Sequence, residues 1–229
     1  GNAGDITIET IGDIQLSGYD ASSTNPSTSD FTFISSNTVG QGNAGKITID
    51  TQGKLYLINN SAILSAIDRT AVGNSQGISI NARELEIANA STIATETFQS
   101  AQVDGKGNAG DINIKTTGDI KISGYDSSVT NPTASDLSQI SSSTQGQGNT
   151  GKTTIDAQGK LSIVNQGSIN SRIYKTAVGN SKGISITARE LELANVAAIS
   201  TRTDQPSRVD GKGNAGDITI ETIGDIQLS

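Results

Sequence analysis

The chain repeats itself with a period of 106 residues. Residues 1–17, GNAGDITIETIGDIQLS, recur unchanged at 213–229, and a close version, GNAGDINIKTTGDIKIS, begins at residue 107. Residues 1–106 align with residues 107–212 without a gap and with 67 identities. We therefore divide the chain into a first unit (1–106), a second unit (107–212) and the start of a third (213–229). Such regularity predicts a repeat architecture, in which each repeat packs against its neighbours.

Each unit contains three shorter repeats, of 41, 31 and 34 residues, and each repeat carries three short runs of alternating apolar and polar residues. The first runs begin at Ile6, Ile47, Ile78, Ile112, Thr153, Ile184 and Ile218, the second at Ile14, Leu55, Leu85, Ile120, Leu161 and Leu191, and the third are centred on Ile34, Ile63, Ile93, Ile140, Ile169 and Ile199. Alternation with a period of two predicts half-buried strands. The pattern predicts an all-β chain folded as a parallel β-solenoid, with three short strands per turn and about six and a half turns.

Glycine and asparagine mark the expected corners of this solenoid. Gly12, Gly53, Gly118 and Gly159 fall between the first and second strands, where a sharp bend is expected to need unusual backbone angles. Gly18, Asn59, Asn89, Gly124, Asn165 and Asn195 follow the second strand. Both residue types tolerate the left-handed conformation, and the asparagines are expected to stack on one another.

Composition excludes several classes of site. The chain has no Cys, His, Met or Trp and a formal net charge of −7. Disulfides, thiolate nucleophiles, imidazole bases and His- or Cys-ligated metals are therefore excluded. The acidic balance disfavours nucleic acid as a partner, and no apolar run approaches the roughly 20 residues that span a bilayer. Because the chain lacks a starting Met and both ends fall within repeats, we expect it to be part of a longer array, or else to stack end to end.

Two outward ladders on the first strands suggest alternative functions. Glu9 and Asp50 are expected to be stacked neighbours, and paired carboxylates of this kind act in polysaccharide hydrolases. Lys115 replaces Glu9 in the second unit, which disfavours catalysis, so we predict that the chain is not an enzyme. A second ladder reads Thr7, Thr48, Ser79, Asn113, Thr154, Ser185 and Thr219. It suggests an ice-binding surface. The simpler interpretation is that Thr and Ser occur there because they favour strands and make cross-strand hydroxyl contacts.

Charged residues form two further columns. They read Asp5, Lys46, Gly77, Asp111, Lys152, Gly183 and Asp217 before the first strand, and Asp13, Lys54, Glu84, Asp119, Lys160, Glu190 and Asp225 before the second. Opposite charges then neighbour each other along the stack, and we expect them to disfavour register slips. Residues 104–111, DGKGNAGD, resemble a calcium turn only faintly, so no cofactor is predicted and calcium is the alternative.

Two matching loops, 18–30 and 124–136, interrupt the repeats once per unit. Their residues Tyr19, Asp20 and Asn25, with Tyr125, Asp126 and Asn131, are the candidate contact residues, for glycans or neighbouring rods. A solvated spacer loop is the alternative reading.

The strings GNAGDITIET and GQGNAGKITID, with residues 60–67 (NSAILSAI), resemble the repeat regions of filamentous-haemagglutinin-type exoproteins, particularly cyanobacterial ones. The resemblance covers essentially the whole chain. It implies a right-handed parallel β-helix, export by two-partner secretion to the bacterial cell surface, and adhesive or structural work without catalytic residues. We therefore expect a stiff extracellular stalk or fibre, whose partners are copies of itself, neighbouring repeats, surface glycans or other cells.

Overall fold

A computed structural model of the chain describes residues 1–18, 31–68, 71–98, 106–124, 137–174, 177–204 and 213–229. The described residues form strands joined by turns, without a helix. The strands are β1 (Ile6–Thr10), β2 (Ile14–Ser17), β3 (Thr32–Thr38), β4 (Ile47–Thr51), β5 (Lys54–Ile58), β6 (Ser61–Ile67), β7 (Ile78–Ala82), β8 (Glu84–Ala88), β9 (Thr92–Thr97), β10 (Ile112–Thr116), β11 (Ile120–Ser123), β12 (Gln139–Thr144), β13 (Thr153–Val164), β14 (Ser168–Ile173), β15 (Ile184–Ala194), β16 (Ala198–Thr203), β17 (Ile218–Thr222) and β18 (Ile226–Leu228).

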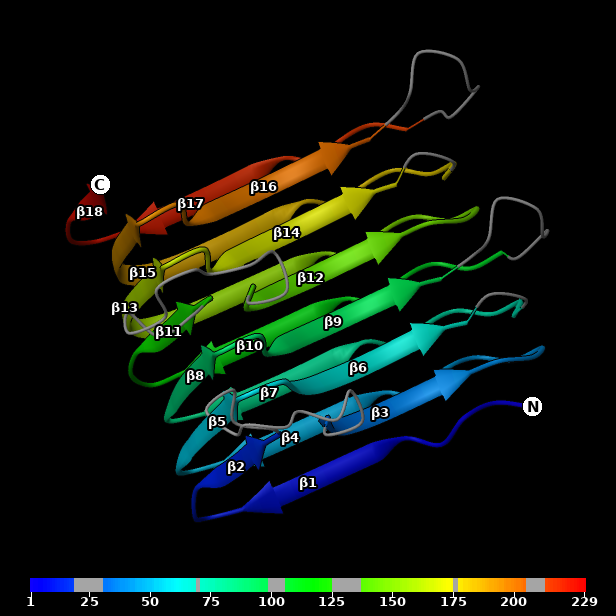
Figure 1. Ribbon diagram of the computed structural model, residues 1–229, viewed down its shortest axis with the longest axis horizontal. Coiled ribbons are helices and arrows are strands. Elements are labelled where there is room, and N and C mark those ends of the chain that lie inside the picture. Colours follow the sequence, from blue (N-terminus) through cyan, green and yellow to red (C-terminus); the bar gives the residue numbers. More distant parts are fainter. Residues whose placement is uncertain (19–30, 69–70, 99–105, 125–136, 175–176, 205–212) are drawn as a thin grey trace, which may run out of the picture.

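The strands pair in parallel and stack in the order of the repeats (Figure 1). One sheet has six strands in the order β16-β14-β12-β9-β6-β3. The other has twelve, because β13 and β15 each continue from a first into a second strand and so join two ladders. The predicted all-β solenoid of stacked parallel strands is confirmed.

The stack continues across the boundary between the two 106-residue units. Strands β10, β11 and β12 of the second unit pair with β7, β8 and β9 of the first. The register is the one that the sequence alignment predicts, since Ile112 lies opposite Ile78 and Ile140 opposite Ile93. The two units therefore belong to one continuous solenoid.

Aliphatic ladders fill the interior. Ile47, Ile49, Leu55, Leu57 and Ile63, all from one repeat, are fully buried, and their counterparts extend the same cluster through the other repeats. One repeat supplies too few apolar side chains to make a core alone. Stacking is therefore what removes this surface from water, at about 25 cal/mol per Å² of apolar area.

The corner glycines between the first and second strands were expected to need unusual backbone angles, and this expectation was wrong. Gly12, Gly53, Gly118 and Gly159 do not have positive φ. At Gly53 there is no room for a side chain. A Cβ there would lie 2.6 Å from the carbonyl carbon of Gly12 and 2.7 Å from the backbone nitrogen of Asp13. The corner thus requires glycine where the backbones of successive repeats approach closely.

The left-handed conformation predicted for the following corner is confirmed for its asparagines but not for Gly124, which does not have a positive φ. Asn59, Asn89, Asn165 and Asn195 have φ values of 56°, 53°, 51° and 54°. The next residue in each case, Asn60, Ala90, Gln166 or Val196, is also left-handed. The asparagines bond in pairs, with Asn89 Nδ2 donating to Asn59 Oδ1 at 3.0 Å and Asn195 Nδ2 to Asn165 Oδ1 at 2.9 Å.

Candidate functional site

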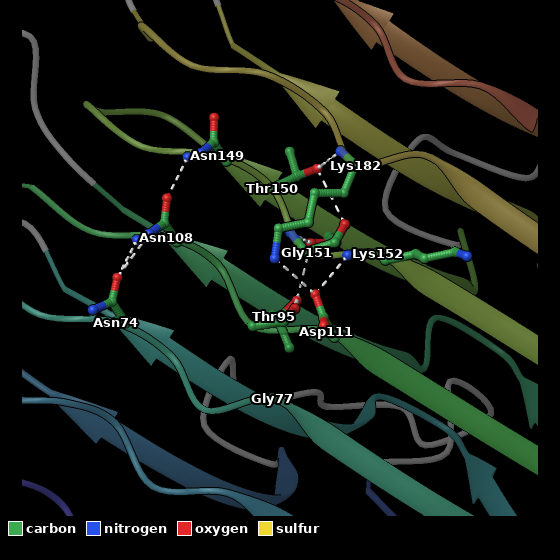
Figure 2. Close-up of polar contacts among 12 residues, drawn as sticks. Asn74, Gly77, Thr95, Asn108, Asp111, Asn149, Thr150, Gly151, Lys152 and Lys182 are labelled. Atoms are coloured by element: carbon green, nitrogen blue, oxygen red, sulfur yellow. Dashed lines mark hydrogen bonds and ion pairs between the residues drawn. The ribbon is translucent and has the colours of Figure 1, made fainter.

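An asparagine ladder runs along the turn that precedes the first strand of each repeat. Its members are Asn2, Asn43, Asn74, Asn108, Asn149, Asn180 and Asn214. At each step the Oδ1 of one asparagine accepts a hydrogen bond from the backbone N–H of the next, over distances of 2.7–3.1 Å. Figure 2 shows Asn74, Asn108 and Asn149 in this arrangement.

The same turns are also joined by their backbones. The residue after each asparagine donates its N–H to the carbonyl of the next asparagine, as Ala109 does to Asn149 at 3.0 Å. Backbone groups in irregular turns need partners when they are removed from water, and the asparagine side chain completes the set where strand pairing does not reach. The sequence analysis missed this ladder, although its signal was the asparagine spacing of 41, 31 and 34 residues, repeated once.

Aspartates provide a second set of contacts between repeats. The Oδ1 atoms of Asp5, Asp13, Asp111 and Asp119 each accept a hydrogen bond at 2.8 Å from the backbone N–H of the lysine at the same position in the next repeat. The aspartates in the predicted charge columns therefore bind backbone rather than only balancing a neighbouring charge. Hydrogen bonds to an ionised acceptor are among the stronger ones in proteins.

Buried hydroxyl groups form a third set inside the solenoid. They come from the third strands β3, β6, β9, β12 and β14, two residues after the central isoleucine of each strand. Ser36 Oγ accepts from Gly45 N–H at 2.9 Å and donates to Gly4 O at 3.0 Å, and Thr95 Oγ1 donates to Gly110 O at 2.7 Å. Where the turn itself carries a hydroxyl, the two pair directly, as Ser171 does with Ser181 at 2.7 Å. These side chains link the third strand by hydrogen bonds to the turn that precedes the first strand.

The charge columns are confirmed in part. Lys54 lies opposite Glu84, and its Nζ is 2.5 Å from Glu84 Oε2. In the second unit Lys160 lies opposite Glu190, as expected, but its Nζ forms an ion pair with Glu192 Oε2 at 2.8 Å. Ser162 Oγ donates a hydrogen bond to the same oxygen. Both contacts lower the pKa of Glu192, and the contact with Lys160 has the larger effect. Such exposed pairs each contribute about 0–1 kcal/mol.

The proposed carboxylate pair lies in register. Glu9 is directly opposite Asp50 in the β1–β4 ladder, and both are exposed. The next member of the column, Asn81, donates a weak 3.5 Å hydrogen bond to Asp50 Oδ2, and in the second unit Lys115 Nζ lies 3.8 Å from Asp156 Oδ2. The hydroxyl-bearing column of Thr7, Thr48 and Ser79 is likewise in register. The residue types change along both columns, so neither repeats one site in every turn.

Residues 104–111 faintly resemble a calcium turn, and Asp111 is the carboxylate of this segment that the structure describes. Its Oδ1 accepts from Lys152 N–H and from Lys182 Nζ at 3.1 Å, as Figure 2 shows. Among the described residues no group of three or more Asp, Glu, His or Cys side chains is placed to hold a metal. The candidate contact residues Tyr19, Asp20, Asn25, Tyr125, Asp126 and Asn131 lie outside the described residues.

Glu96 differs from the other described carboxylates because burial raises its pKa to about 7. It occupies an outward position of β9, between Ala66 of β6 and Ser143 of β12, both of which are buried. Within the described ranges it has no hydrogen-bonding or ionic partner to offset the loss of hydration.

No protein-family model matches this chain, and no curated protein or solved structure matches it. In the ranges that the structure covers, no helix is long and apolar enough to cross a membrane.

Proposed function

We propose that this chain is a structural, non-enzymatic segment of a secreted exoprotein of the filamentous-haemagglutinin type, forming a stiff stalk or fibre at the cell surface. In this proposal the solenoid is right-handed, with three short strands per turn and about six and a half turns. Its immediate partners are neighbouring repeats, in the same chain or in adjacent rods, and it displays loops to glycans or other cells.

The observation that carries the proposal is the asparagine ladder. In six successive repeats an asparagine side chain at the same place binds the backbone of the next repeat. An enzyme needs one particular constellation of side chains, whereas this feature recurs at every step. Repetition of one contact along the stack gives each interface between repeats similar strength, which suits a rod that resists bending and extension.

A single-molecule pulling experiment tests the mechanical role. The 229-residue chain is held at its two ends, and the force that unravels it is measured. We expect resistance well above that of an unfolded chain, and a lower unfolding force for Asn108→Ala. This substitution removes the acceptor for the N–H of Asn149, which lies 2.8 Å away, and should lower the stability by about 1 kcal/mol.

Asn113→Ala is the matched control, because Asn113 is an exposed, outward residue of β10 in the same unit. It should leave the unfolding force unchanged. A wild-type chain that extends without resistance, or an equal loss of force in both variants, would contradict the mechanical proposal.

A carbohydrate-cleaving function is the second candidate, and the register of Glu9 with Asp50 is the observation that favours it. Incubation of the unmutated chain with a panel of polysaccharides decides it. Cleavage that is lost in Glu9→Gln would support this candidate, and intact polysaccharide after prolonged incubation would eliminate it.

A further inference from the structure

The two 106-residue units differ most on one surface, the outward face of the six-stranded sheet. Strands β3, β6 and β9 of the first unit correspond to β12, β14 and β16 of the second. Over the eighteen positions that both sets share, the nine inward residues are the same in the two units, while eight of the nine outward residues differ. On the twelve-stranded sheet, eight of fourteen outward residues are the same. The core has thus been kept while this one face has changed.

The change converts an apolar and acidic face into a polar and basic one. In the first unit the outward residues include Phe33, Leu64, Ala66, Ala94 and Glu96. Their counterparts in the second unit are Gln139, Asn170, Arg172, Ser200 and Arg202. Asp68, just beyond β6, is replaced by Tyr174 just beyond β14. Stacking requires none of these replacements, because outward side chains do not enter the core.

The replaced residues line one surface pocket. Six of its lining residues are Gln139, Asn170, Arg172, Tyr174, Ser200 and Arg202. Ser200 Oγ donates to Asn170 Oδ1 at 2.8 Å, and Asn170 Nδ2 reaches Ser168 Oγ at 2.9 Å and Gln139 Oε1 at 3.4 Å. Amide and hydroxyl groups thus form a connected row across three neighbouring strands.

Two arginines and a tyrosine complete the pocket. Arg172 and Arg202 both contact the carboxylate of Asp204, whose side chain is only 7 % exposed. Burial alone would raise the pKa of Asp204, but the two guanidinium groups outweigh it and hold that pKa below its usual value. The guanidinium carbon of Arg172 also lies 4.2 Å from the centre of the Tyr174 ring. One carboxylate shared by two arginines leaves a net positive charge, fixed in place by ionic and cation–π contacts.

We propose that this pocket binds an acidic polysaccharide through its uronate carboxylates. Guanidinium groups match the planar geometry of a carboxylate, and Arg202 is 65 % exposed and available to a ligand. The row of amide and hydroxyl groups suits sugar hydroxyls, and the edge of Tyr174 offers an apolar surface to a sugar ring. The binding site does not depend on the mechanical role proposed above, since a folded chain suffices for it.

Binding of polygalacturonate oligosaccharides to the full 229-residue chain tests the proposal, with calorimetry at low and high salt. We expect saturable binding that weakens as salt increases, and no binding of neutral dextran oligosaccharides. Arg202→Glu, which installs the residue of the first unit, should raise the Kd about tenfold or more. Asn170→Leu, which also installs the first-unit residue, should weaken binding without a change in charge. Lys152→Gln is the control, because Lys152 is exposed and directly precedes β13 on the other sheet.

Several outcomes would overturn the inference. They are the absence of polygalacturonate binding to the unmutated chain, equal weakening by Arg202→Glu and Lys152→Gln, and unchanged binding in Asn170→Leu. Binding of dextran sulfate with no binding of polygalacturonate would contradict the assignment to carboxylates. Far-ultraviolet circular dichroism of each variant shows whether it is folded, and Asn170→Leu tests the pocket independently should Arg202→Glu not fold.

Discussion

Asparagine has two distinct backbone roles in this chain. In the ladder its carboxamide oxygen replaces a missing carbonyl acceptor, as Asn108 does for the N–H of Asn149. At the corner after the second strand, Asn59 and its counterparts adopt the left-handed conformation that most residues avoid. Both roles use a short side chain that can bond to nearby backbone, and neither requires a catalytic group.

Val196 occupies a left-handed position with φ of 65°, which is unfavourable for a β-branched side chain. The equivalent residue in another repeat, Asn60, has φ of 59°. We therefore expect Val196→Asn to stabilise the chain by about 1 kcal/mol and to raise Tm by about 2–4 °C. Thermal unfolding measures this, with Val178→Asn as the control at an exposed valine whose φ is not positive. An equal or lower Tm for Val196→Asn would show that the backbone strain is absent.

Glu96 predicts a pH dependence. Its pKa is about 7 in the folded chain, against 4.5 for an ordinary Glu, so the folded state binds more protons than the unfolded state between these values. Stability from this group therefore falls as pH rises from about 4.5 to about 7. We expect Glu96→Gln to stabilise the chain by about 1–3 kcal/mol at pH 8 and to have little effect at pH 4.

Urea unfolding at the two pH values measures this difference. Glu9→Gln, which changes an exposed carboxylate, is the control and should have little effect at either pH. The same gain for Glu96→Gln at pH 4 and pH 8 would refute the role of ionisation.

At the scale of the element, the decisive structures are the turns between strands. Side-chain carboxamides, carboxylates and hydroxyls bind the turns of successive repeats to one another, and glycine allows their backbones to approach. The strands supply the aliphatic ladders, but the turns determine which repeat stacks on which, because a shifted turn would lose its asparagine and aspartate contacts together.

Gly53 and Gly12 form a matched pair for the close approach of two turns. A Cβ at Gly53 would lie within 3 Å of the Gly12 and Asp13 backbone, whereas a Cβ at Gly12 would meet nothing closer than Thr10 Oγ1 at 3.9 Å. We expect Gly53→Ala to destabilise the chain by about 1–3 kcal/mol and Gly12→Ala to change its stability by much less. Chemical denaturation of both variants measures this, and similar values for the two would contradict the packing argument.

The strands were predictable from the sequence because their side chains alternate between core and solvent. Ile47 and Ile49, with Leu55 and Leu57, show the pattern and are buried as expected. The turn contacts were harder to predict, because Asn43 in its turn, or Ser36 in its strand, has many partners available until the stacking register is known. Once the register is fixed, each hydrogen-bond partner is the matching residue of the next repeat or of the adjoining turn.

The polar pocket on the six-stranded sheet could not be predicted from periodicity. Arg172 and Tyr174 come from one repeat and Asp204 from the next, and the side chains of Arg172 and Asp204 meet because β14 and β16 stack in register. The sequence signal was the replacement of Ala66 by Arg172 and of Asp68 by Tyr174 between the units. Its meaning required knowing which positions face outward.

At the scale of the whole molecule, the chain is a continuous stack in which each repeat contacts its neighbours. Pairing across the unit boundary shows that the stack of strands continues from the first 106-residue unit into the second without a break. The asparagine ladder runs along the stack together with the aliphatic core, and aspartate and hydroxyl contacts add to it at particular repeats. Stiffness in such a molecule comes from repeating the same contacts between neighbouring repeats.

Amide hydrogen exchange at the asparagine ladder tests this account most directly. The account predicts that the N–H groups of Asn74, Asn108, Asn149 and Asn180 exchange about 100-fold or more slowly than in an unstructured peptide. It also predicts that Asn108→Ala removes protection at Asn149 while Asn180 stays protected. Exchange of these amides at the rate of an unstructured peptide in the unmutated chain would contradict the central claim that side-chain ladders join the repeats.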